Sequence, residues 1–133
     1  MLNVVRASAA ALLLGAFIAP SLSAADAGEA AFKEKVWPII EKSCTGCHGA
    51  EKQKGKLRLD TKEAWLKGGE NGKMVEPGKP EKSDVVKMIK WAHEDPDYNM
   101  PPKKKDKNTQ LSAEQVAIIE EWIKAGMPWP AAK

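Results

Sequence analysis

The residues best able to do chemistry lie in one pentapeptide, Cys44-Thr45-Gly46-Cys47-His48. Two cysteines separated by two residues and followed directly by histidine have the spacing of covalent c-type haem attachment. At a helix end, two such thiols can reach the two vinyl groups on one edge of a porphyrin, and His48 is then placed to bind the iron. Gly46 would relieve crowding where the backbone meets the ring. The pattern predicts one haem c, attached through Cys44 and Cys47 and ligated by His48.

Three other uses of the cysteines fit the chain less well. A thioredoxin-type redox pair has the same spacing but calls for a βαβ setting, and no segment shows the sustained two-residue alternation of a strand. A structural zinc site would need both cysteines and both histidines of the chain, and their spacing fits no finger pattern. A disulfide across two residues is strained and would leave His48 unexplained.

A low-spin electron carrier needs a second axial ligand, for which methionine and histidine are the usual choices. Met100 is favoured, because the two prolines after it disfavour a helical backbone and would present its sulfur from a stiff loop. His93 and an open coordination site remain alternatives. Met88, on the apolar face of a predicted helix, is expected to fill the core. Met127 is expected to pack at the end of the last helix, whereas nothing in the sequence fixes the direction of Met74.

Residues 1–25 have the order of a secretory signal peptide, and residues 26–133 are expected to form a single domain. One base, Arg6, precedes a largely apolar stretch of 13 residues, Ala7–Ala19, and small residues follow Pro20. That stretch is shorter than the roughly 20 residues of a membrane span. We therefore expect an exported, periplasmic or equivalent, soluble protein with no membrane span once the signal is removed.

The charge balance is weak. The chain has 21 Lys+Arg and 18 Asp+Glu, and removing residues 1–25 takes away Arg6 alone, which leaves 20 basic and 18 acidic side chains, or +2. Nucleic-acid binding, which favours a strongly basic face, is therefore not expected. Two lysine groups flank the chemistry-bearing residues and form either solvated loops or a basic collar that steers an acidic redox protein. These groups are Lys52, Lys54 and Lys56, and Lys103–Lys105.

Apolar periodicity predicts an all-α domain of about four short helices, joined by long loops that wrap one covalent haem. The helices are expected near residues 32–44, 61–67, 83–95 and 112–126, after a frayed start at residues 25–31.

Capping signals place the helix ends. The predicted N-caps are Asp60 (with Glu63), Ser83, and Ser112 (with Gln115). Pro38 should kink the first helix or mark its true first turn.

The chain resembles the planctomycete-type cytochrome c domain, a relative of the class I monohaem cytochromes c, from about Phe32 to Trp129. The resemblance rests on six segments in the family's order: Cys44–Gly49, Gly55–Thr61, Lys67–Glu70, Val75–Ser83, Met100–Pro102 and Trp122–Gly126. It implies a class I cytochrome c-like fold and makes His48 and Met100 the axial pair of the haem iron.

These observations lead us to expect an electron carrier rather than an enzyme. With both axial positions filled, the iron would exchange one electron with redox protein partners and would offer no vacant site to a substrate. Two alternatives stay open. One is a peroxidase-like enzyme or gas sensor with a displaceable Met100, and the other is an electron-relay subunit of a larger exported oxidoreductase.

Overall fold

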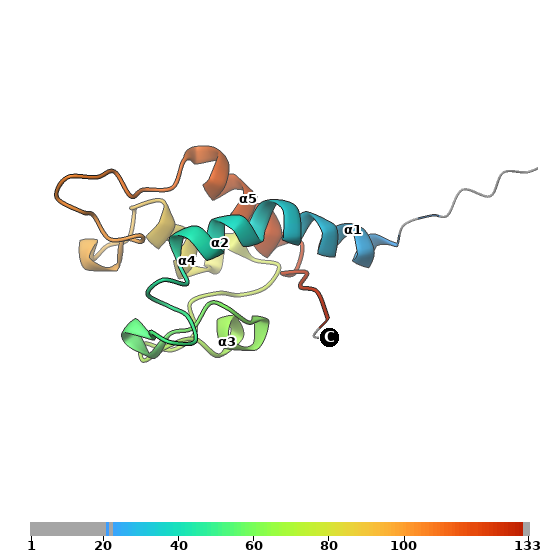
Figure 1. Cartoon of the computed structure of the whole chain (residues 1–133), viewed down its shortest axis with the longest axis horizontal. Coiled ribbons are helices and arrows are strands. Elements are labelled where there is room, and N and C mark those ends of the chain that lie inside the picture. The colour runs from blue at the N-terminus through green and yellow to red at the C-terminus, as the bar shows by residue number, and fades with distance from the viewer. Residues whose placement is uncertain (1–20, 22, 132–133) are drawn as a thin grey trace, which may run out of the picture.

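The computed structural model describes residues 21 and 23–131, and these form short helices joined by loops (Figure 1). The α-helices are α1 (Ala24–Ala31), α2 (Trp37–Ser43), α3 (Lys62–Lys67), α4 (Asp84–Ile89) and α5 (Ala113–Lys124). Extended pairing in the described residues is limited to isolated bridges. The predicted all-α class is therefore confirmed.

The first helical rod begins earlier than expected. Residues 25–31 were predicted to be frayed, but they lie in α1, which begins with a capping box between Ser23 and Asp26. The Asp26 amide donates to Ser23 Oγ at 3.2 Å, and the Ser23 amide donates to Asp26 Oδ2 at 3.3 Å. No side chain of α1 is buried, so the apolar period that reveals other helices is missing here. Most of the predicted signal peptide lies outside the described residues.

Pro38 perturbs the first rod without ending it. A π-helical segment, η1 (Phe32–Val36), joins α1 to α2, and the Trp37 amide donates to the Phe32 carbonyl. Because proline has no amide hydrogen and its ring crowds the carbonyl four residues earlier, a wider turn before it relieves the clash. The rod therefore runs continuously from α1 through α2 (Figure 1).

Two of the predicted caps are wrong. Thr61, and not Asp60, caps α3 by accepting the Ala64 amide at 3.2 Å, because Asp60 pairs with Arg58 instead. Ser83 makes no cap hydrogen bond to α4. The third predicted cap is confirmed at α5, where Ser112 and Gln115 form a reciprocal capping box.

An aromatic cluster fills the core where α5 packs against η1. Phe32 lies 5.7 Å from Trp122 and 4.2 Å from Trp129, measured between ring centroids, and Trp65 meets Trp122 edge-on at 5.3 Å. The buried indole of Trp65 donates to the Leu59 carbonyl at 2.9 Å, so its polar atom is satisfied. Full burial of each large apolar side chain contributes about 1.5–3 kcal/mol, which makes this cluster the main support of the rod.

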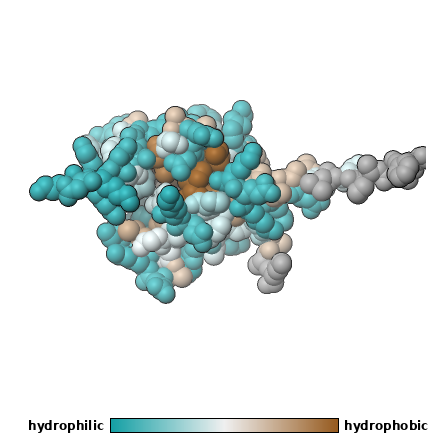
Figure 2. Space-filling view, turned by 45° about the horizontal axis from the view of Figure 1, so that its top comes forward, coloured by the Kyte–Doolittle hydropathy of each residue, from teal (hydrophilic) through white to brown (hydrophobic). Residues whose placement is uncertain are grey.

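The surface is mostly hydrophilic. Figure 2 shows one face on which hydrophilic residues surround a small hydrophobic patch near its middle. No helix among residues 23–131 combines the length and apolar character that crossing a bilayer requires.

Candidate functional site

The pentapeptide forms a tight turn at the end of α2. The Cys44 amide continues the helix by donating to the Ile40 carbonyl at 2.8 Å, and the Cys44 carbonyl then accepts from the amides of Cys47 at 3.1 Å and His48 at 2.9 Å. The Cys44 carbonyl thus holds Cys47 and His48 close to Cys44 within one turn. The structure confirms that the helix ends here and shows how the sequence brings both thiols and the imidazole into one turn.

The chain then folds back on this turn, and Gly49 makes that possible. A Cβ at Gly49 would lie 2.5 Å from the Thr45 carbonyl oxygen, closer than any side chain tolerates. The amide of Leu59 donates to the His48 carbonyl at 2.8 Å, and that of Lys54 donates to the Cys47 carbonyl at 3.0 Å. His48 is therefore held by backbone bonds on both sides. By contrast, nothing lies within 4 Å of a Cβ built at Gly46.

Both cysteines are free and half-buried. Burial raises the pKa of the Cys44 thiol to about 12, so this thiol is neutral near pH 7. Reactive redox cysteines and zinc ligands are instead thiolates in surroundings that lower the pKa. No three His, Cys, Asp or Glu side chains within the described part of the chain come together to hold a metal ion. The described side chains therefore form no cluster of the kind that a structural zinc ion requires.

The His48 ring presents its two nitrogens differently. Nδ1 is buried and has no hydrogen-bond partner, whereas Nε2 is not among the buried unpartnered atoms of the described residues. Burial lowers the pKa of His48, and backbone groups of Lys54 and Leu57 oppose that shift. The neutral imidazole is the form that binds a metal. His48 is thus suited, as a neutral imidazole, to ligate a metal.

This donor set fits haem c. Two free thiols and an imidazole whose buried Nδ1 has no hydrogen-bond partner among the described residues lie on one turn. Cys44 and Cys47 would hold the group covalently and His48 would ligate its iron, as the sequence predicts. The structure places these three residues together.

Met100 lies on a different segment, two residues after the 3₁₀ turn η4 (Pro96–Tyr98). Its side chain is half-buried, and its amide donates to the Met88 carbonyl at 2.9 Å. Met74 and Met127 are 8% and 0% exposed, so both sulfurs are packed in the core. The prediction for Met127 is confirmed, and Met74 proves to be a core residue as well. Met88 is half-buried, so the expectation that it fills the core is wrong.

The side chain of His93, the alternative axial ligand, makes contacts within its own loop. Its Nδ1 accepts the Asp95 amide at 3.1 Å, and its ring lies 5.0 Å from the Tyr98 ring, centroid to centroid. These contacts, which involve Nδ1 and the ring face, restrain the imidazole within its own loop.

Trp91 is a residue whose position sequence reasoning did not anticipate. The other four tryptophans belong to the aromatic cluster, but Trp91 follows α4 with a left-handed backbone (φ 55°). Its amide donates to the same Met88 carbonyl as Met100 does, at 3.1 Å. Its indole Nε1 is buried without an acceptor, which is rare for a buried donor. Strain and an unmatched donor thus occur together beside Met100.

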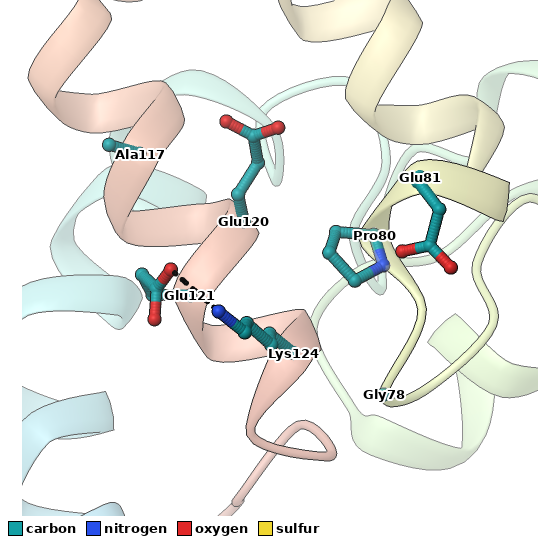
Figure 3. A pocket seen from close by; sticks show the side chains of 7 residues that line it. All are labelled: Gly78, Pro80, Glu81, Ala117, Glu120, Glu121 and Lys124. Atoms are coloured by element: carbon teal, nitrogen blue, oxygen red, sulfur yellow. Dashed lines mark ion pairs between the residues drawn. The ribbon is translucent and has the colours of Figure 1, made fainter.

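A surface hollow between α5 and the 3₁₀ turn η3 (Pro80–Lys82) lies elsewhere (Figure 3). Two of its carboxylates are neutralised by lysines, since Glu120 pairs with Lys90 and Glu121 lies 3.8 Å from Lys124. The full lining is Gly78, Pro80, Glu81, Ala117, Glu120, Glu121 and Lys124. It contains no thiol, imidazole or thioether and has no part in the predicted chemistry.

Comparison with known proteins identifies the domain. Residues 44–104 match the family model described as Planctomycete cytochrome C. The match begins at Cys44 and includes His48 and Met100, while α2 and α5 lie outside it. A search of curated proteins and a search of solved structures each found no match. Assignment to class I and a domain boundary at residue 26 stay predictions. The matched segment, in a helical fold, supports a planctomycete-type cytochrome c domain.

Proposed function

We propose that this protein transfers single electrons between redox proteins through one haem c, attached at Cys44 and Cys47, with His48 and Met100 as the axial ligands. The observation that carries the proposal is the turn in which one carbonyl gathers both cysteines and His48. The haem supplies the Fe(III)/Fe(II) couple when bound. The protein supplies attachment, a neutral imidazole and a soft sulfur ligand.

Met100 is the best-supported second ligand. Met74 and Met127 are buried in the core, and His93 is engaged with Asp95 and Tyr98. A thioether raises the reduction potential relative to a second histidine. Filling both axial positions leaves no vacant site for a substrate, so the proposal is a carrier and not an enzyme.

The absorption spectrum of the oxidised protein tests this assignment. We expect a methionine-to-iron charge-transfer band that is lost in Met100→Ala. Met88→Leu is the matched control, because Met88 is also half-buried and its carbonyl, which holds Met100, is kept. Loss of the band in Met88→Leu alone would assign the ligand to Met88, and a band that survives in both variants would refute the proposal.

A second candidate is a haem enzyme or gas sensor in which Met100 leaves the iron. The chain after Met100 favours this possibility, because Pro102 and the next six residues are exposed and extend at the end of the molecule opposite α1 (Figure 1). A high-spin ferric spectrum of the untreated protein would support this candidate. An electron-relay subunit is a further form of the carrier, and co-purification with a larger oxidoreductase would reveal it.

We also propose that the partner is an acidic redox protein that docks on the two lysine groups. All six side chains are exposed, and none forms a salt bridge with another described residue. They are therefore available to steer a partner, an effect that salt weakens. The groups are Lys52, Lys54 and Lys56, and Lys103–Lys105.

Replacing Lys103–Lys105 with glutamine should slow electron transfer at low salt and have little effect at high salt. Replacing Lys33, Lys35 and Lys42, which are exposed on the first rod, controls for net charge alone. Equal rates in the two triple variants at low salt would contradict docking on the collar.

Export completes the proposal. Residues 1–25 would be removed as a signal peptide, which would deliver the chain to the periplasm or an equivalent compartment. Intact mass of the protein isolated from that compartment checks this. A mass that retains residues 1–25 would contradict it.

A further inference from the structure

The three residues that end at Met100 are each tied to a different segment. Tyr98 accepts a hydrogen bond on its hydroxyl from Asn71 Nδ2 at 3.1 Å. Asn99 accepts the His93 amide on its side-chain oxygen at 3.2 Å. The Met100 amide donates to the Met88 carbonyl at 2.9 Å. We call the first two contacts the Met100 tethers.

One tether is long-range and the other lies within the loop between residues 93 and 99. The Tyr98 contact joins residues 27 positions apart, and the Tyr98 ring also lies against His93, which Asn99 holds from the other side. After Met100 the next side-chain hydrogen bonds are made at the far end of the loop, from Thr109 Oγ1 to the Pro102 carbonyl at 2.8 Å and from Gln110 Nε2 to the Lys90 carbonyl at 3.4 Å. Met100 is thus anchored on its N-terminal side and followed by an exposed loop.

We propose that Tyr98 and Asn99 are positioning residues that restrain Met100 against displacement by an external ligand. The inference rests on Met100 being an axial ligand, as proposed above. If Met100 ligates the iron, its displacement is opposed wherever its segment would shift, because each tether stabilises the unshifted segment. The ligand-exchange equilibrium shifts by the free energy of the bonds lost in the moved state. The tethers therefore weaken the binding of an external ligand by the free energy of the bonds that they make.

The tethers are separate from the core. Asn71 is exposed, and Tyr98 and Asn99 are half-buried. None of the three belongs to the hydrophobic cluster. Removing a tether should therefore change the position of Met100 without unfolding the domain, which separates this role from a general contribution to stability.

The test is imidazole binding to the oxidised, haem-loaded protein. Binding is measured as the loss of the methionine-to-iron band. Tyr98→Phe removes the hydroxyl and keeps the ring against His93, and Asn99→Ala removes the other tether. One lost hydrogen bond predicts an imidazole Kd roughly two- to tenfold tighter. Asn108→Ala is the matched control, since Asn108 only accepts the amide of Gln110 at 3.1 Å, beyond Met100.

A double variant sharpens the test. Asn71→Ala and Tyr98→Phe remove the same hydrogen bond, so combining them should tighten imidazole binding no more than either alone. Unchanged Kd values in Tyr98→Phe and Asn99→Ala, or an equal change in Asn108→Ala, would overturn the inference. If the unmodified protein shows no band that depends on Met100, the proposed ligation fails and the inference fails with it. A normal band with unchanged Kd values refutes the tethers alone.

Discussion

Replacing Gly49 with alanine should disrupt the turn formed by Cys44–His48. The added Cβ would lie 2.5 Å from the Thr45 carbonyl oxygen, whereas ordinary contact begins at 3.4 Å, so the two must separate by 3.4 − 2.5 = 0.9 Å. The obstacle is backbone, and Thr45 cannot turn away as a flexible side chain would, because its own amide is bonded to the Ile40 carbonyl at 3.1 Å. Overpacking of this kind costs about 1–3 kcal/mol.

For a domain of this size, a loss of about 2 kcal/mol lowers Tm by roughly 10 °C. The change in Tm is measured by monitoring thermal unfolding of the haem-loaded protein with circular dichroism. Gly46→Ala is the control in the same turn, because a Cβ there meets no protein atom within 4 Å and the backbone φ is not positive. A Tm within about 2 °C of the parent for Gly49→Ala would refute the steric argument. If Gly46→Ala is equally damaging, contact with the haem, and not the protein backbone, limits this turn.

Three further outcomes follow from the same structure. Ser83→Ala should lower the free energy of unfolding, measured by urea titration, by about 1–3 kcal/mol. The buried hydroxyl accepts the Glu76 amide and donates to the Lys79 carbonyl, at 2.9 Å each. Ser83→Thr, which keeps the hydroxyl, is the control. The Arg58 hydrogen bonds lower the pKa of Asp60, so their stabilisation is present above the ordinary value of 3.8 and is lost as pH falls through the lower folded pKa. Asp60→Asn should therefore reduce Tm at pH 7 but have little effect near pH 2, and a Tm difference that does not depend on pH would contradict this. Cys44→Ser combined with Cys47→Ser should leave an unfolded or degraded chain, because the long loops have too little core without haem, and a helical, cooperatively melting apo-protein would be the opposite result.

Local signals predicted the helix ends only where no other group competed for the capping side chain. The capping box at Ser112 formed as expected because both partners lie in the same turn. Asp60 was assigned as a cap, but its carboxylate binds Arg58 at 2.7 Å, and Thr61 takes its place at the helix. Ser83 has the right type for a cap but bonds the loop near Glu76 instead. In both errors, a charged or buried partner outweighed a modest capping energy.

The burial of individual methionine and tryptophan side chains was also not predictable from local signals. Periodicity placed Met88 on a core-facing stripe, yet it is only half-buried, whereas Met74, which has no periodic signal, packs in the core. Five tryptophans were visible in the sequence, but only the fold separates Trp91 from the other four. Burial depends on which elements pack together, and a single segment does not encode that.

The sequence by itself predicted the chemistry of attachment, because Cys44, Cys47 and His48 lie within one turn and their spacing brings them together. It also determined the all-α class, since helix periods and one strong capping box are local properties. Only the tertiary structure decided that Gly49 is the glycine the turn needs, that His93 is occupied by its neighbours, and that Tyr98 and Asn99 anchor the segment of Met100. Each of these depends on groups brought together by the fold, and in the tether to Asn71 they are separated by 27 positions in the chain.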